Sequence, residues 1–130
     1  MVCNLKDSIM PEYQGIRIPW SESSGTAFTN IVHITETICT PFATRQFQLL
    51  GLLPAVDGHP RVLDNACGSG RQTETLCEAY ADAGRAIDIT CCDISPAMIG
   101  LVERRIKDRN WTNVKTVLVS AEARASKETL

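Results

Sequence analysis

One segment, from Arg61 to Gly70, constrains the fold of this chain more than any other. It reads RVLDNACGSG: a short apolar strand, an acidic residue, and a turn that contains two glycines. The pattern predicts that Asp64 lies at the carboxyl end of a strand, where open α/β sheets bind ligands. Glycines lack a β-carbon, so Gly68 and Gly70 allow a sharp turn and a close approach of a ligand. A helix after this turn points its free N–H groups at the same place, so the segment predicts a small-molecule cofactor site.

The residues that follow alternate between helical and strand patterns. Apolar residues recur at helical spacing after the turn, and Gly84 is a typical helix stop. Ser95 followed by Pro96 is a typical helix start, with serine as the N-cap. The expected elements are therefore a strand from Arg61, a helix over 71–84, a strand over 87–92, a helix from Ser95 to about Arg109, and a strand over 114–119.

Asp93 follows the second expected strand, about 20 residues past the glycines, as a ribose-binding carboxylate requires. Its two oxygens can accept hydrogen bonds from two hydroxyls. A dinucleotide site is the main competitor, but its G-x-G-x-x-G/A pattern needs a small third residue where Thr73 stands. That pattern also does not call for an acidic residue before the glycines, whereas Asp64 is present. A P-loop is excluded, because no Gly-Lys-Ser/Thr follows the turn.

Three segments, VLDNACGSG, CCDISPAMIGLVERRI and VKTVLVSAEA, resemble the first three cofactor motifs of class I S-adenosylmethionine-dependent methyltransferases. The resemblance covers residues 61–124. The first motif of that family is an acidic residue followed by a glycine-rich turn, which Asp64, Gly68 and Gly70 match. Ala66 stands where many members have a first glycine, which is a common departure. The resemblance implies that S-adenosylmethionine is the cofactor.

The resemblance also implies roles for residues beyond the turn. Asp93 matches the family's ribose-binding acid, and Met98 matches a position that packs on the adenine ring, although Met98 equally fits a helix core. The third motif usually reads Asp-Ala, whereas Ser120-Ala121 stands here, so the carboxylate expected near the adenine amino group is missing. The cofactor-binding residues implied are Asp64, Ala66, Cys67, Gly68, Gly70, Asp93, Ile94, Met98, Ser120 and Ala121.

Composition argues against several classes of function. The net charge is -2 and no basic cluster stands out, so nucleic acid is not expected as a partner. Residues 103–109 (ERRIKDR) are mixed in sign and predict a solvated helix face. No apolar run approaches the roughly 18 residues of a membrane span. The N-terminus lacks the apolar core of a secretory signal, so a cytoplasmic protein without membrane contact is expected.

The six cysteines do not predict a metal site. None forms a C-x-x-C pair, and His33 and His59 show no ligand spacing to them. We interpret them as buried thiols of a reducing cytosol. Cys67 is the alternative candidate for a catalytic thiol, because the turn places it near a helix N-terminus, which lowers a thiol pKa.

The N-terminal part predicts irregular structure and then helices. Residues 27–38 have apolar residues near helical spacing, although their β-branched content leaves a strand open. A further helix is expected to open at Pro41 with Thr40 as its cap, to bury Phe42, Phe47, Leu49 and Leu50, and to end near Gly51. The resemblance makes this segment a cap over the cofactor and makes Tyr13, Trp20, Phe28 and His33 conceivable site residues. Packing is the simpler interpretation of each, with His33 a core histidine.

Together these patterns predict an α/β chain: a partial Rossmann-like methyltransferase fold with a parallel sheet and an N-terminal helical segment. Residues 1–57 are the cap segment and 58–130 a β-α-β-α-β half-domain. The expected function is methyl transfer from S-adenosylmethionine to a small-molecule acceptor, with no catalytic base identified. The alternatives are a non-catalytic, truncated cofactor-binding module and a fragment of a dinucleotide-dependent oxidoreductase. Because the sheet is partial, we interpret the chain as a fragment or a truncated product, and completion of the sheet by self-association or by a partner chain is the alternative.

Overall fold

The computed structural model describes residues 27–119, and it confirms the predicted alternation of strands and helices. Each expected strand and helix boundary after residue 60 lies within two residues of the observed one. The elements are α2 (Val32–Leu49), β1 (Arg61–Asn65), α3 (Arg71–Asp82), β2 (Asp88–Asp93), α4 (Pro96–Arg109) and β3 (Val114–Leu118).

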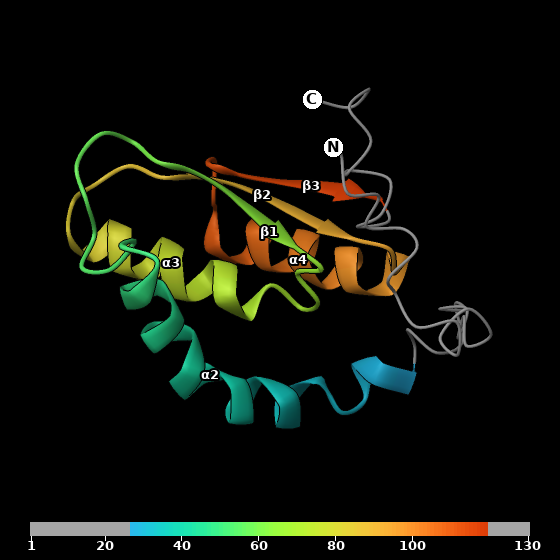
Figure 1. The fold of residues 1–130 in the computed structure, drawn as a ribbon. Coiled ribbons are helices and arrows are strands. Elements are labelled where there is room, and N and C mark those ends of the chain that lie inside the picture. The colour runs from blue at the N-terminus through green and yellow to red at the C-terminus, as the bar shows by residue number, and fades with distance from the viewer. Residues whose placement is uncertain (1–26, 120–130) are drawn as a thin grey trace, which may run out of the picture.

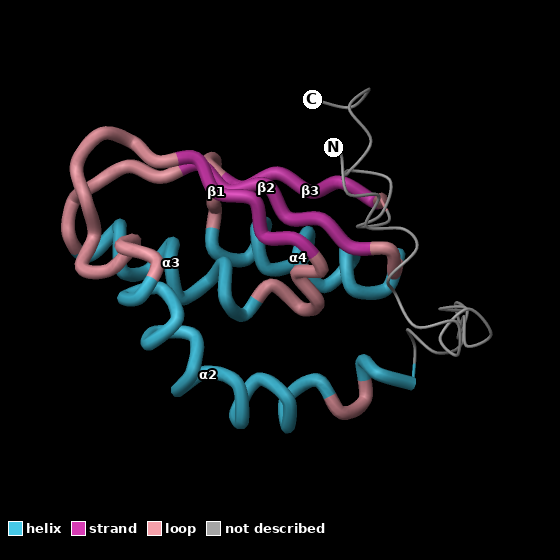
Figure 2. Tube along the Cα trace, in the orientation of Figure 1, coloured by secondary structure: helices cyan, strands magenta, loops and turns pink. Residues whose placement is uncertain are grey.

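The three strands form one parallel sheet in the order β1-β2-β3. In its register, Asp64 of β1 is opposite Cys91 of β2, and Asp93 at the end of β2 is opposite Leu118 of β3. Figure 1 shows α3 and α4 together on one face of the sheet, with α2 as an outer layer beyond them. Figure 2 shows that the loops after β1 and β2 leave the sheet at the same end. Ligands of such sheets bind at this end.

The hydrophobic core lies between the sheet and the two helices that cover it. Helix α3 contributes Leu76 and Tyr80, and α4 contributes Val102. Helix α2 adds only Ala43 and Phe47. The buried apolar cluster consists of Ala43, Phe47, Cys67, Leu76, Cys77, Tyr80, Ile87, Ile89, Cys91, Ile99, Val102 and Val114.

Local chemistry ends and starts the helices where the sequence predicts. Ser95 caps α4, because its hydroxyl oxygen accepts a hydrogen bond from the N–H of Met98 at 3.4 Å. Gly84 follows the end of α3, where the N–H of Arg85 returns to the carbonyl of Tyr80 at 2.9 Å. This is a Schellman arrangement, which satisfies carbonyls that the helix leaves without partners.

The N-terminal prediction is wrong in one respect: residues 32–49 form one helix, with Pro41 in its interior. Thr40 is not an N-cap, since its hydroxyl donates to the carbonyl of Glu36 at 2.6 Å within the same helix. Proline removes one helical hydrogen bond, but α2 is held by the Arg71–Thr40 hydrogen bond before Pro41 and by the buried Phe47 after it. In one continuous helix Phe47 is buried whereas Phe42 is 71% exposed, and Leu49 and Leu50 are exposed as well.

Among residues 27–119, no helix combines the length and the apolar character that a membrane span needs.

Candidate functional site

The two predicted carboxylates lie at the carboxyl ends of neighbouring strands, with the glycine turn between them. Asp64 is in the last residues of β1, and Asp93 ends β2. The hydrogen bonding between β1 and β2 extends into the turn, because the N–H of Cys67 donates to the carbonyl of Cys92 at 2.9 Å. The structure therefore brings together the residues that sequence reasoning placed at one site.

The carboxylate of Asp93 binds backbone N–H groups on both sides of the site. One carboxylate oxygen accepts the N–H of Gly68 at 2.9 Å, and the other accepts the N–H of Ser95 at 2.9 Å. A carboxylate offers about four acceptor positions. Asp93 is partly exposed, so it can accept further hydrogen bonds from a ligand. Sequence reasoning predicted the position of this acid but not its bond to the turn.

Asp64 is anchored by a residue from α3. The hydroxyl of Thr73 donates to a carboxylate oxygen of Asp64 at 2.7 Å, and it lies 3.1 Å from the Cys91 sulfur. Burial raises the pKa of Asp64, the Thr73 hydrogen bond opposes this rise, and the nearby charge of Asp93 adds to it. Thr73 therefore fixes the orientation of Asp64, a role that the sequence pattern did not suggest.

The turn needs left-handed backbone at three alternate positions. Ala66, Gly68 and Gly70 have φ of +58°, +55° and +79°. A β-carbon on Gly68 would meet nothing within 4 Å, so there is open space beside the turn. A β-carbon on Gly70 would lie 3.0 Å from a methyl group of Val102 in α4. Gly68 thus leaves room for a ligand, whereas Gly70 lets α4 pack close behind the turn.

Three other residues of the predicted set differ in exposure. Ile94, directly after Asp93, is 49% exposed and presents an apolar surface. Met98 is buried in the core, which agrees with its packing interpretation, and its contact with adenine stays a prediction. Cys67 is also buried, and a hydrogen bond with Cys91, burial and nearby carboxylates raise its pKa. The expectation of a thiol pKa lowered by the helix N-terminus is wrong. Ser120 and Ala121 lie outside the described residues.

Sequence reasoning missed an ion-pair network that is centred on the buried carboxylate of Glu74. Glu74 of α3 is 2% exposed and pairs with Arg71, Arg105 and Arg109, the last at 2.8 Å. Burial alone would raise the pKa of Glu74, but the hydrogen bond from Arg71 and the three arginine charges outweigh it and lower that pKa. The prediction of a solvated face over 103–109 is therefore wrong for Arg105. The acid that attracts these arginines is 31 residues away from Arg105 in sequence, beyond the reach of a local pattern.

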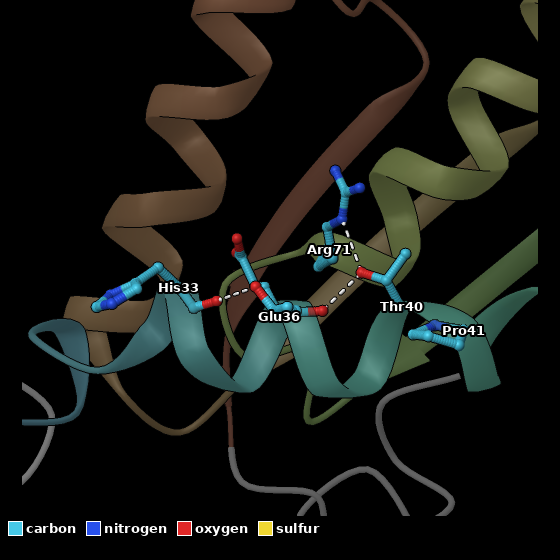
Figure 3. Close-up of a pocket in the computed structure, with 6 residues that line it drawn as sticks. His33, Glu36, Thr40, Pro41 and Arg71 are labelled. Atoms are coloured by element: carbon cyan, nitrogen blue, oxygen red, sulfur yellow. Dashed lines mark hydrogen bonds between the residues drawn. The ribbon is translucent and has the colours of Figure 1, made fainter.

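A groove of about 450 Å³ lies between α2 and the start of α3. The groove is lined by His33, Glu36, Thr37, Thr40 and Pro41 of α2 and by Arg71 of α3. In Figure 3 the Arg71 side chain lies beside Thr40, whereas the His33 ring points away from both. Arg71 donates to the Thr40 hydroxyl at 3.2 Å. His33 is exposed, so its interpretation as a core histidine is wrong. Phe28 is half-buried, while Tyr13 and Trp20 lie outside the described residues.

Comparison with known proteins gives one matching family model, described as "Methyltransferase domain", over residues 62–129. Among curated proteins, the acetylaranotin bis-thiomethyltransferase of Aspergillus terreus is 30% identical over 96 residues, which are 73% of this chain and 35% of that protein. The malonyl-[acyl-carrier protein] O-methyltransferase of a Paenibacillus species is 33% identical over 48% of this chain and 21% of its own length. The chain thus spans about a third or less of these relatives.

Solved structures share the fold at low identity. The Methanococcus maripaludis protein mmp1179 superposes with a TM-score of 0.56 and 14% identity, over 81% of this chain and 44% of that one. The [4+2]-cyclase SpnF superposes with a TM-score of 0.55 and 19% identity, over 79% of this chain and 43% of that one. These matches agree with a partial Rossmann-like fold.

Proposed function

Because the chain belongs to the methyltransferase domain family, we propose that it supplies the cofactor-binding part of an enzyme that methylates a small molecule with S-adenosylmethionine. The observation that carries the proposal is the pair Asp64 and Asp93, held by Thr73 and by backbone N–H groups at adjoining strand ends. Between these acids lies a turn with open space at Gly68.

The described residues fit such a cofactor. Asp93 has acceptor positions left for the ribose hydroxyls after its two backbone bonds. Ile94 offers an exposed apolar surface next to that acid, as a purine ring requires. Asp64 can accept from an ammonium group, while Gly68 leaves space for close contact with the backbone. We therefore assign the ribose to Asp93 and the methionine end to Asp64.

S-adenosylmethionine supplies a methyl group on a sulfonium, which a nucleophile displaces in line. The protein's task in such a reaction is to hold the two reactants close and aligned. Asp64 and Asp93 are held by hydrogen bonds from Thr73, Gly68 and Ser95, so they orient a ligand without first having to be ordered. An acceptor hydroxyl would also need a base, and we assign none.

A small-molecule acceptor is our proposal for the substrate class. One of the two relatives is a bis-thiomethyltransferase and the other an O-methyltransferase, so they do not single out the methylated atom. The groove beside Arg71 has about 450 Å³, within the usual range for small-ligand sites. The net charge of -2 gives no electrostatic support for a nucleic-acid or membrane partner.

A second candidate is a cofactor-binding module that transfers no methyl group. The fold shared with the [4+2]-cyclase SpnF favours this alternative, because one fold serves different reactions. Methyl-transfer assays of the chain with thiol and hydroxyl acceptors separate the two candidates. Turnover would exclude the second candidate.

We also propose a cytoplasmic location and a sheet that is completed by self-association or by a partner chain. Buried thiols without disulfides at Cys67, Cys77 and Cys91 fit a reducing compartment. Leu63 on β1 and Val117 and Leu118 on β3 are exposed, and such apolar residues favour further packing on the sheet.

Calorimetric titration of S-adenosylhomocysteine into the 130-residue chain tests the proposed function, with NAD as the control ligand. Asp93→Ala is expected to weaken binding by about 1–3 kcal/mol, the scale of a hydrogen bond to a charged group. Asp88→Ala is the matched control, because Asp88 starts the same strand at its opposite end. Binding of NAD alone would point to a dinucleotide site. Equal affinity in a folded Asp93→Ala variant would contradict the ribose assignment.

A further inference from the structure

The cofactor turn is held from a second side, by a glutamate in α2. A carboxylate oxygen of Glu36 accepts the hydroxyl of Ser69, the residue between the two turn glycines, at 2.5 Å. The same oxygen accepts a guanidinium N–H of Arg105 in α4 at 2.6 Å. Ser69 is 7% exposed, so water does not readily replace this bond. Glu36 thus joins α2, the turn and α4 at one atom.

The rest of α2 near Glu36 has little else to hold it. The buried residues of this helix are Ala43 and Phe47, both in its second half. In the first half Ile34 and Ile38 are exposed, so apolar packing does not fix that half against the protein. The polar contacts of Glu36 and the Arg71–Thr40 hydrogen bond connect this half of the helix to α3, α4 and the turn.

Glu36 and Asp93, which belong to different elements, fix adjacent residues of the turn. Asp93 accepts the N–H of Gly68, and Glu36 accepts the hydroxyl of Ser69. Arg105 in turn orients Glu36, and it is itself held by the buried carboxylate of Glu74. The position of the turn is therefore set by side chains from β2, α2, α3 and α4 together.

We propose that Glu36 is a positioning residue for the cofactor turn, so that cofactor affinity depends on a side chain of α2. This inference rests on the proposed function, because it assigns the turn to S-adenosylmethionine. It adds that the outer helix α2 is part of the binding machinery. When the hydrogen bond between Glu36 and Ser69 is broken, the turn loses a side-chain anchor, and the first half of α2 loses its bond to the turn.

The test compares Glu36→Gln, Ser69→Ala and the double variant with the wild-type chain. Calorimetry with S-adenosylhomocysteine is expected to show affinity about tenfold lower in each single variant. Ser69→Ala removes the donor of this hydrogen bond, and Glu36→Gln replaces its charged acceptor with a weaker amide oxygen. Because both changes act on the same bond, the double variant is expected to bind about as weakly as Ser69→Ala alone. Glu78→Gln is the matched control, since Glu78 is an exposed α3 acid that pairs only peripherally with Arg109 at 3.4 Å; its affinity is expected to stay at the wild-type level.

Amide hydrogen exchange provides a readout that needs no ligand. The N–H groups of Gly68 and Gly70 are bonded to Asp93 and to the Cys67 carbonyl at 2.9 and 3.0 Å, so both are protected. Both should exchange about tenfold faster in Glu36→Gln and in Ser69→Ala, while amides of β2 keep their rates. Ser69→Ala leaves the Glu36–Arg105 pair intact, so it remains informative if Glu36→Gln fails to fold.

The possible failures are distinguishable. If the wild-type chain binds S-adenosylhomocysteine and the single variants bind equally well, the positioning role is refuted while the proposed function stands. If the wild-type chain does not bind, the proposed function fails together with the link to cofactor affinity. Unchanged exchange at Gly68 and Gly70 in both variants would refute any positioning of the turn by Glu36.

Discussion

The contact between Gly70 and Val102 gives the sharpest test of how the turn is built. A β-carbon on Gly70 would lie 3.0 Å from the Val102 Cγ2, at a φ of +79°. Gly68 also has positive φ, +55°, but a β-carbon there would meet nothing within 4 Å. Gly68→Ala therefore isolates the effect of left-handed backbone, and Gly70→Ala adds a steric clash to it.

The expected magnitudes follow from these two terms. A left-handed alanine costs about 1–2 kcal/mol, and the smaller entropy of the unfolded chain offsets about 0.4–1 kcal/mol of that. Gly68→Ala should thus lower the free energy of unfolding by about 1 kcal/mol. Val102 is fully buried, so the clash at Gly70 adds about 1–3 kcal/mol of overpacking. Gly70→Ala should then lower the free energy of unfolding by about 2–4 kcal/mol.

Urea denaturation followed by circular dichroism measures both changes. Val102→Ala removes the methyl groups that a β-carbon at Gly70 would meet, so the two changes are expected to couple favourably by about 1–3 kcal/mol in a double-mutant cycle. The same Val102→Ala change should not couple to Gly68→Ala. Equal destabilisation by the two glycine replacements, or additive behaviour of Gly70→Ala with Val102→Ala, would refute the reasoning.

Two further predictions concern stability. Ala66 has φ of +58°, so Ala66→Gly should raise the free energy of unfolding by about 0.5–1 kcal/mol in the same assay, and a loss of stability would contradict the assigned strain. The pKa of the Glu74 carboxyl is lowered in the folded chain. The ionised carboxylate therefore stabilises the fold fully above the ordinary pKa of 4.5, and this stabilisation is lost as the pH falls through the pKa of the folded state. Glu74→Gln should therefore be less stable than wild type at pH 7, by roughly 2 kcal/mol because its arginine partners are partly solvated, with a difference that shrinks in acid. A difference independent of pH between 7 and 2 would argue against the ion pairs.

The strands, the helices after residue 60 and the positions of the two acids could be predicted because their signals are local. Ser95 with Pro96 starts a helix wherever it stands, and Gly84 stops one, with little dependence on the rest of the fold. Asp64 and Asp93 follow directly from where each strand ends. Parallel strands then place both acids at one edge without further information.

The rest depends on contacts that no local pattern contains. Glu36 and Ser69 are 33 residues apart in the chain, and Glu36 and Arg105 are 69 apart. A charged segment such as 103–109 reads as solvated unless the buried acid opposite it is known. Pro41 similarly predicts a helix start, and only the tertiary contacts on both of its sides explain why α2 continues through it. Local preference was outweighed by packing in both cases.

The 69-residue separation between Glu36 and Arg105 has a kinetic consequence. Contacts that close long segments form only after the intervening elements have assembled, because chain entropy opposes them until then. The sheet, α3 and α4 must all be in place before Arg105 can reach α2. The bond from Glu36 to the cofactor turn is therefore expected to be among the last events of folding, and the turn acquires its second anchor only on a fully assembled chain.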